Sequence, residues 1–202
     1  MNEPVASRVS TYPCFFAAVF ALATMASLVG TTAAQTQKTL GTLNSSDGMF
    51  PWSLTMDANG NLYGTTYEGG SYGSGTVFEV LRLPGGSWQI EALHSFKGGW
   101  DGQGPQAGLV MDSAGNLYGT TTWGGVPCNG RSEGCGTVFK LTHLLGQTWT
   151  KTILHTFSQF SDGGQPSANL ILDSAGNLYG TTSAFGNLND CGRSRFQAIT
   201  QA

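Results

Sequence analysis

One heptapeptide, Gly-Asn-Leu-Tyr-Gly-Thr-Thr, occurs three times in this chain without a single change. The copies occupy residues 60–66, 115–121 and 176–182. A chain that repeats its turn and strand residues at a long, nearly constant period repeats a supersecondary unit, and this signal outranks any local propensity. The sequence therefore predicts a tandem array of similar units.

An Asp stands three residues before each copy, at Asp57, Asp112 and Asp173, which gives repeat spacings of 55 and 61 residues. We interpret Asp-x-x-Gly-Asn as a hairpin turn, in which Gly takes a positive φ and the Asp side chain accepts hydrogen bonds from turn amides. Calcium binding by these Asp residues is the alternative. Each turn offers only one carboxylate, so turn capping is preferred and no metal site is predicted.

Each repeat contains about four segments with the character of β-strands. An apolar run precedes the turn, and Leu-Tyr-Gly-Thr-Thr follows it, with its Gly expected where another backbone passes close. Gly-Thr-Val-Phe at 75–78 and 136–139 opens a third strand with period-2 alternation, and a fourth starts at Trp88 or Trp149. Four short strands in roughly 55 residues are typical of a propeller blade. We therefore predict an all-β fold of tandem four-stranded antiparallel blades, an incomplete β-propeller-like array; another β-repeat stack and an unrelated all-β fold are the alternatives.

The repeat region spans residues 35–192, with units at about 47–100, 101–161 and 162–192, the last one truncated. Each unit opens with Asp-Gly-x-x-Pro, and its Asp is assigned a role in a turn. These residues are Asp47, Asp101 and Asp162. Lys38 to Leu43 resembles the last strand of a blade whose other strands are absent.

Residues 193–202 form a tail without repeat character, which indicates a truncation or a reading-frame change near residue 192. Closed propellers have about 4–8 blades, so an array of this length does not close alone. Its open edge strands are expected to favour self-association.

Residues 1–34 are typical of a secretory signal peptide. Arg8 precedes an apolar run at 15–29, and Thr32-Ala33-Ala34 fits the small-x-small rule, which places the cleavage after Ala34. The run is shorter than the ~20 residues of a membrane-spanning helix, and an uncleaved anchor is the alternative. The mature chain is therefore expected to be extracytoplasmic, secreted or at the cell surface, with no membrane span.

Composition excludes some classes of function. Hydrophobic residues make up 40% of the chain, enough to bury a core, so disorder is not expected. The formal net charge is −3 and no basic cluster occurs, which argues against a nucleic-acid partner.

The repeated motifs resemble those of the GloVer tandem-repeat family of exported bacterial proteins. Besides the heptapeptide, they are Gly-Gly at 69–70 and 124–125, Gly-Thr-Val-Phe twice and Leu-His-x-Phe twice, and the similarity covers about Leu40 to Cys191. The resemblance implies an extracytoplasmic, usually surface-anchored repeat protein of unassigned activity.

Cys128 and Cys135 flank a loop that is six residues longer in the second repeat than in the first. Outside the cytoplasm such a pair most simply forms a disulfide, worth roughly 2–3 kcal/mol by limiting the unfolded ensemble. A zinc site is the alternative and lacks two further ligands. Cys191 is then left over.

No catalytic or cofactor-binding residue is predicted. His94 and His155 occupy equivalent positions, which indicates a structural slot. Serine-nucleophile, zinc-protease and Walker motifs do not occur, and no helix follows the Gly-rich loops to form a phosphate site.

Five aromatic residues fall in or near loops: Trp52, Tyr67, Tyr72, Trp100 and Trp123. Packing between blades is preferred for them; if exposed, they form a face for a sugar or a protein. The expected function is that of a non-catalytic structural or surface-binding module for an extracellular protein or glycan. The alternatives are a secreted carbohydrate-active propeller enzyme, which needs two acids around a cleft, and a gene remnant.

Overall fold

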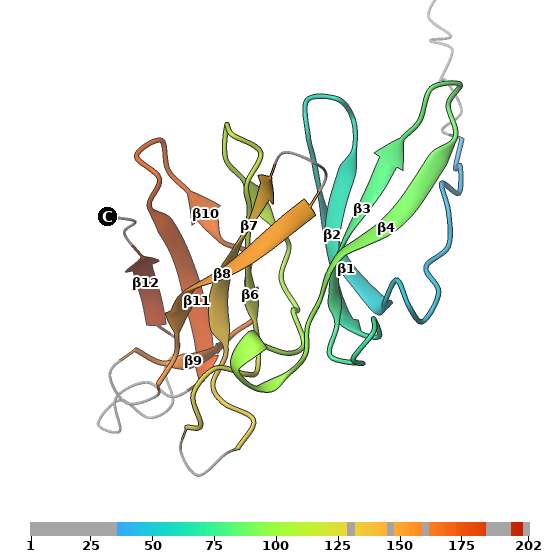
Figure 1. The fold of residues 1–202 in the computed structure, drawn as a ribbon. Helices are drawn as coiled ribbons and strands as arrows, with labels where there is room; N and C mark the ends of the chain where they lie inside the picture. Colours follow the sequence, from blue (N-terminus) through green and yellow to red (C-terminus); the bar gives the residue numbers. More distant parts are fainter. Residues whose placement is uncertain (1–35, 129–131, 145–147, 159–161, 185–194, 200–202) are drawn as a thin grey trace, which may run out of the picture. The chain divides into compact units, whose positions relative to one another are not determined.

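The computed structural model shows a series of antiparallel sheets built from consecutive stretches of the chain (Figure 1). It describes residues 36–128, 132–144, 148–158, 162–184 and 195–199. The expected signal peptide at 1–34, with its cleavage site after Ala34, lies outside these residues. Residues 39–202 form one compact unit, to which the following description applies.

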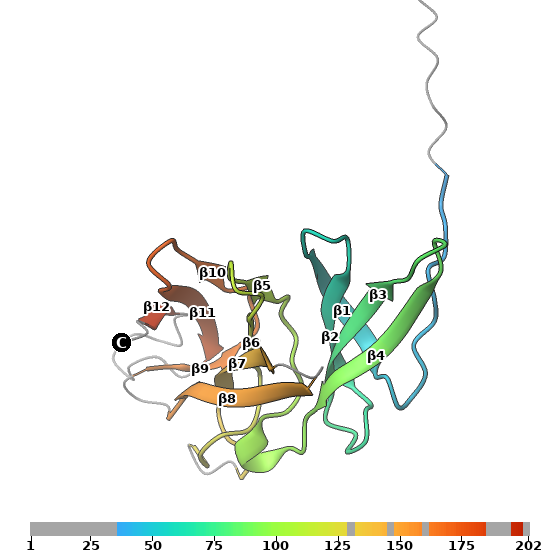
Figure 2. The ribbon, with the colours of Figure 1, turned by 45° about the horizontal axis from the view of Figure 1, so that its top comes forward.

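Three sheets follow one another along the chain (Figures 1 and 2). Sheet 1 contains β1 (Met49–Met56), β2 (Leu62–Glu68), β3 (Thr76–Arg82) and β4 (Trp88–Ser95). Sheet 2 contains β5 (Val110–Met111), β6 (Leu117–Thr121), β7 (Thr137–Leu144) and β8 (Thr148–Thr156). In sheet 3, β9 (Gly164–Pro166) and β10 (Ile171–Leu172) both pair with β11 (Leu178–Ala184), which pairs with β12 (Arg195–Ile199).

Every strand pair is antiparallel, and the described residues contain one short 3₁₀ helix, η1 (Gly99–Asp101), and no α-helix. The predicted all-β fold of tandem four-stranded antiparallel sheets is confirmed. No helix in the described part of the chain is long and apolar enough to cross a membrane.

The Asp-containing turns form as predicted. Oδ1 of Asp57 accepts hydrogen bonds from the backbone N–H groups of Asn59 (2.8 Å) and Asn61 (2.9 Å), and Oδ2 accepts one from the Asn61 side chain. Gly60 takes a φ of 84°, which a side chain would strain. Asp112 and Asp173 bind their own turns with the same pattern. These hydrogen bonds all lie within one hairpin, so the turn needs no contact with another sheet.

The Gly in each Leu-Tyr-Gly-Thr-Thr strand is required for a different reason from the one expected. A Cβ on Gly119 would lie 2.6 Å from the Phe139 ring and 2.8 Å from Leu109 Cδ2, so side chains, not another backbone, fill the space above it. Gly64 meets Phe78 and Leu54 in the same way. The expectation of a close backbone is therefore wrong, and the Gly serves side-chain packing.

The strand β12 lies in the segment that was expected to lack repeat character. Thr182 is opposite Arg195, as Thr66 is opposite Thr76 and Thr121 opposite Thr137. In sheets 1 and 2 the two Thr hydroxyls hydrogen-bond each other, at 2.9 and 2.8 Å. Among the described residues the buried Thr182 hydroxyl has no hydrogen-bond partner, and the residue opposite it is Arg195 where sheets 1 and 2 have a Thr.

The hydrophobic core lies between consecutive sheets. One cluster joins sheets 1 and 2: Tyr63, Val77, Phe96, Leu109, Leu117, Phe139 and Leu141. A second joins sheets 2 and 3: Tyr118, Cys128, Cys135, Val138, Phe157, Leu170 and Leu178. Equivalent residues of the repeat recur in both clusters, so each sheet packs on the next in the same way.

A candidate binding pocket between sheets 1 and 2

A pocket of about 760 Å³ lies where the Asp-containing turns of sheets 1 and 2 approach each other. Sheet 1 contributes the β1–β2 turn, with side chains from β2 and β3. Sheet 2 contributes the β5–β6 turn, the end of β7 and the start of β8. The polar and aromatic side chains that line it are Asp57, Asn59, Asn61, Tyr63, Glu79, Asp112, Ser113, His143 and Trp149.

The buried Tyr63 joins two acids in this pocket. Its hydroxyl lies 2.9 Å from Oε1 of Glu79 and 3.3 Å from Oδ2 of Asp57. Tyr63 is 6% exposed, and its ring meets that of Trp149 edge to face at 6.3 Å between centroids. Two carboxylates in the same wall thus face one hydroxyl, whose single proton is nearer to Glu79.

The two acids have opposite shifts in pKa. Burial raises the pKa of Glu79, and the Asp57 charge adds to this effect, although the Tyr63 hydrogen bond opposes it. Burial would also raise the pKa of Asp57, but hydrogen bonds from Asn61, Asn59 and Tyr63 outweigh it and lower the pKa. Burial and the hydrogen bond to Glu79 raise the pKa of Tyr63, which keeps its hydroxyl protonated.

Sheet 2 supplies an aromatic wall. The His143 ring stacks on Trp149 at 4.8 Å between centroids, with 25° between the planes. Trp149 packs against the core cluster, whereas His143 is exposed. The pocket therefore combines an aromatic surface with hydrogen-bonding groups that include three acids.

The repeat pattern contained a signal for this pocket that the sequence interpretation did not use. Glu79 stands where sheet 2 has Lys140, and His143 stands where sheet 1 has Arg82. Both residues break the repeat. Asp57 and Asp112, assigned only to turns, line the pocket as well as capping their hairpins.

A second polar cluster joins the same two sheets away from the pocket. The Lys151 ammonium lies 2.5 Å from Oδ1 of Asp101 and also donates to the Asp101 backbone carbonyl. The other carboxylate oxygen of Asp101 lies 3.1 Å from Nε2 of His94 and accepts the Lys97 backbone N–H. Lys151 is 7% exposed at its side chain and stacks over the Phe96 ring. A largely buried ion pair therefore connects η1, in the segment after sheet 1, to β8 of sheet 2.

The predicted structural role of the repeated His is confirmed. His155 Nε2 lies 3.0 Å from Oδ2 of Asp162, as His94 lies beside Asp101, and each ring packs edge to face on the Phe two residues on. The partner was not foreseen, because the His and the Asp belong to different motifs.

The pKa values in this cluster follow from its contacts. Burial would raise the pKa of Asp101, but hydrogen bonds from His94 and Lys151 and from the Lys97 N–H outweigh it and hold the pKa well below its ordinary value. For Lys151 the balance is reversed: burial lowers its pKa despite the contacts with Asp101. The carboxylate is thus stabilised in its charged form, and the ammonium depends on it.

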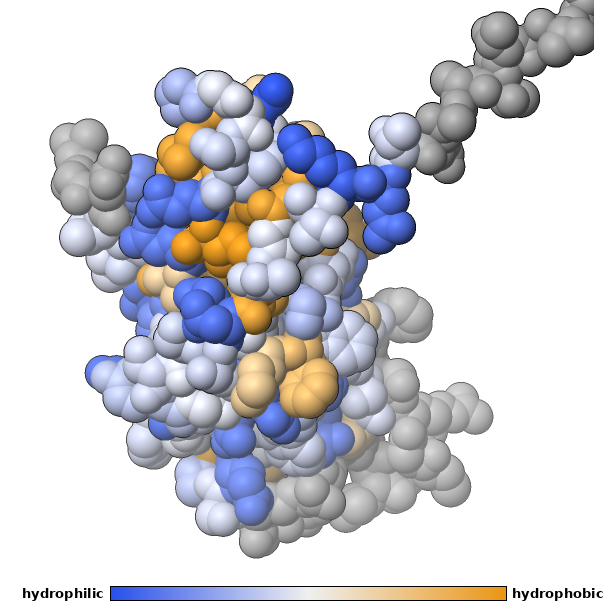
Figure 3. Space-filling model, turned by 90° about the vertical axis from the view of Figure 1, so that its right-hand side faces the viewer, coloured by the Kyte–Doolittle hydropathy of each residue, from blue (hydrophilic) through white to orange (hydrophobic). Residues whose placement is uncertain are grey.

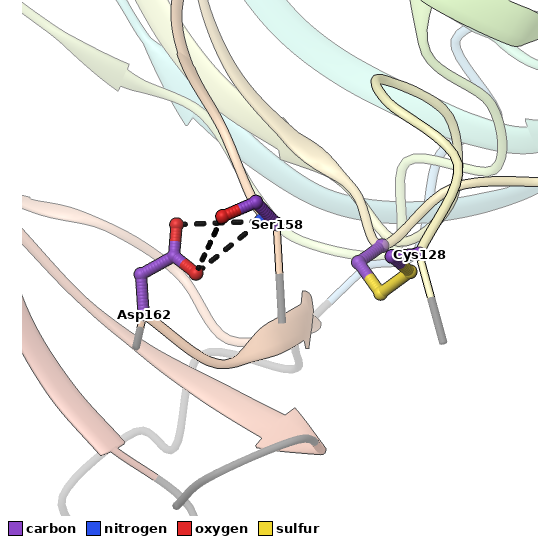
Figure 4. The surroundings of a disulfide bond; sticks show 4 residues. Cys128, Ser158 and Asp162 are labelled. Atoms are coloured by element: carbon purple, nitrogen blue, oxygen red, sulfur yellow. Dashed lines mark hydrogen bonds between the residues drawn. A yellow bond between two sulfur atoms is a disulfide. The ribbon is translucent and has the colours of Figure 1, made fainter. Parts of the chain in front are cut away.

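Cys128 and Cys135 form a disulfide in the structure (Figure 4). Their Cα atoms are 5.9 Å apart, and both residues are buried in the cluster between sheets 2 and 3. The Cys135 carbonyl accepts the Gln165 N–H, so the bridged loop also contacts sheet 3.

Replacing both cysteines by alanine is expected to lower the free energy of unfolding by about 2–3 kcal/mol, because the short bridged loop gains freedom in the unfolded chain. Urea unfolding with and without reductant measures this. Reductant should destabilise the wild type and leave the double variant unchanged. Free thiols at both positions in non-reducing mass spectrometry would contradict the bridge.

Three loop aromatics are not packed. Trp52 is 49% exposed, Tyr72 57% and Trp100 70%. The preference for packing is wrong for these residues, because their loops and strand face the solvent. Tyr67 and Trp123 are half-buried and lie against Gly104.

Consecutive four-stranded sheets with a shared turn, a shared register and a shared packing face define an all-β repeat protein. Residues 24–193 match the Gloeobacter/Verrucomicrobia repeat, and the chain belongs to this repeat family. The resemblance expected from the motifs is confirmed. No curated protein matches the sequence.

Proposed function

We propose that this repeat protein is exported and binds a neutral or amino-containing glycan in the pocket between sheets 1 and 2, without catalysis. The observation that carries the proposal is the lining of the pocket, in which Glu79, Asp57 and Asp112 surround the Trp149 wall. Sugars combine hydroxyl groups, which carboxylates bind with strong hydrogen bonds, with apolar faces that pack on aromatic rings.

The charge of the pocket selects among glycans. Three carboxylates and a single exposed His line it, so a sulfated or uronic acid ligand would meet like charges. A neutral sugar meets only acceptors and donors, and an amino sugar gains an ionic contact.

Export is supported by the apolar run at 15–29 between Arg8 and Thr32-Ala33-Ala34. A disulfide between Cys128 and Cys135 fits an oxidising compartment. N-terminal sequencing of the exported chain tests this part: the first residue should be Gln35.

Glycan binding is tested by array screening of the purified chain, followed by titration calorimetry on the sugar bound best. Glu79→Gln should weaken binding about tenfold, because it replaces a charged acceptor by a neutral one of the same shape. Trp149→Ala should abolish binding, whereas Trp88→Ala, at the equivalent position of sheet 1 outside the pocket, should leave the affinity unchanged. Equal affinity in the wild type and Glu79→Gln would reject the proposal.

A secreted hydrolase is the second candidate, favoured by one observation. Glu79 and Asp57 contact the same hydroxyl and have pKa values shifted in opposite directions, which is how paired carboxylates divide acid and base roles. Release of reducing ends that Glu79→Gln abolishes would establish the hydrolase and sink the non-catalytic proposal.

A further inference from the structure

Sheets 1 and 2 present the same socket to the sheet that follows. Leu109 of sheet 2 packs in the cluster that contains Tyr63 of sheet 1, and Leu170 of sheet 3 packs in the cluster that contains Tyr118 of sheet 2. Leu109 is 5% exposed and Leu170 is 4% exposed. The contact between consecutive sheets is therefore the same in both places. A Leu of one sheet packs on the surface around the Tyr of the sheet before it, and we call this surface the socket.

Sheet 3 carries the same socket uncovered. Tyr179, the equivalent of Tyr63 and Tyr118, is 41% exposed, whereas those residues are 6% and 3% exposed. Its hydroxyl lies 3.0 Å from Oδ2 of Asp173, as that of Tyr118 lies 2.9 Å from Asp112. The side chain is thus already held in the orientation that receives a Leu.

Sheet 1 carries the matching Leu uncovered. Leu54 is 51% exposed, although its Cδ2 lies 2.8 Å from the Cβ position of Gly64, as Leu109 lies over Gly119. Met56, also on β1, is 64% exposed. Figure 3 shows apolar surface gathered on the side where sheet 1 lies. Leu54 therefore has the same position over its Gly as the buried Leu109, but no neighbouring sheet buries it.

The outer strands are complementary too. In sheets 1 and 2, β3 and β7 each pair with a fourth strand, whereas β12 is outermost among the described strands of sheet 3. Residues 40–43 match the end of such a fourth strand in sequence, and Gly41 lies against Ile90 of β4. Ile90 is the equivalent of Lys151, whose ammonium lies over the ring of Phe96, the residue after the end of β4. Residues 40–43, which form no strand here, thus lie beside sheet 1 as the segment that ends β4 lies beside sheet 2.

We propose that a second copy of this chain docks head to tail: Leu54 of one copy enters the Tyr179 socket of the other, and residues 40–43 pair with the open edge of β12. The two surfaces differ, so the contact is heterologous. Two copies close a ring if the rotation allows, and longer assemblies form if it does not. This inference does not depend on glycan binding.

Sedimentation velocity of the full chain over a range of concentrations tests the proposal. The wild type should associate as concentration rises, and Leu54→Arg and Tyr179→Arg should each remain monomeric. Both side chains are exposed, so the variants should keep the wild-type circular-dichroism spectrum. Leu144→Arg, at a site 48% exposed on the middle sheet, is the control and should associate like the wild type.

Mixing the two monomeric variants is the decisive step. Each retains one intact surface, so the mixture should form a pair that neither forms alone. A wild type that stays monomeric at all concentrations, association that survives both substitutions, or a mixture that stays monomeric would overturn the head-to-tail contact. Association that does not need the contact between Leu54 and Tyr179 would appear as the second of these results.

Discussion

Asp101→Ala is expected to lower the free energy of unfolding by about 3–5 kcal/mol, because it leaves the Lys151 ammonium largely buried without its carboxylate. The same change removes the acceptor for the Lys97 N–H and the partner of His94. Urea unfolding at neutral pH measures the loss. Asp47→Ala is the matched control: Asp47 holds the same repeat position in sheet 1, where the residue equivalent to Lys151 is Ile90, and its loss should cost under about 1 kcal/mol.

A double variant separates the ion pair from simple loss of packing. Asp101→Ala with Lys151→Ile introduces the residue that sheet 1 has at this position and removes the unpaired charge. It should be more stable than Asp101→Ala alone, since an apolar replacement of a buried pair is often close to neutral. A double variant less stable than the single one would show that the ammonium is not the source of the loss.

The same cluster predicts how stability depends on pH. The folded-state pKa of Asp101 lies below its unfolded value of about 3.9. Its contribution is therefore complete above that value and is lost progressively as the pH falls toward the folded-state pKa. The difference in unfolding free energy between the wild type and Asp101→Asn should be constant from pH 5 to 7 and shrink below about pH 4. A difference that grows with acidity would contradict the assignment.

Leu109→Ala is expected to cost about 2–5 kcal/mol, because Leu109 is 5% exposed and fills the space between the first two sheets. Leu54→Ala removes the same side chain from the same repeat position, where it is 51% exposed. It should change the free energy of unfolding by less than about 0.5 kcal/mol. The comparison is made by urea unfolding at concentrations low enough to keep the chain monomeric. Equal losses of unfolding free energy would show that Leu54 is buried in solution, as Leu109 is.

The repeated turns and strands could be predicted from sequence because their determinants are local. The Asp57 carboxylate caps amides two and four residues away, and period-2 alternation marks β3 and β7. The contacts that build the pocket are not local. Tyr63 and Glu79 are sixteen residues apart and meet across two paired strands, so only the register brings them together.

The exposure of the aromatic side chains could not be predicted from the sequence either. Trp100 and Tyr72 are apolar enough to pack, but they remain 70% and 57% exposed, and the Lys97 ammonium lies over the Tyr72 ring. The first strand of each sheet also differs in length: β5 and β10 contain two residues each, whereas β1 contains eight and a bulge. A register shift of this kind leaves no mark in residue type.

Nearly every strand in this chain pairs with its nearest neighbour along the sequence, through hairpins that cap themselves. Pairing between strands that are neighbours in the sequence shortens the loops that must close before a native pair forms. Each unit is therefore able to begin folding once its own strands are present, without waiting for the residues that follow it, and docking onto the preceding unit becomes the later step.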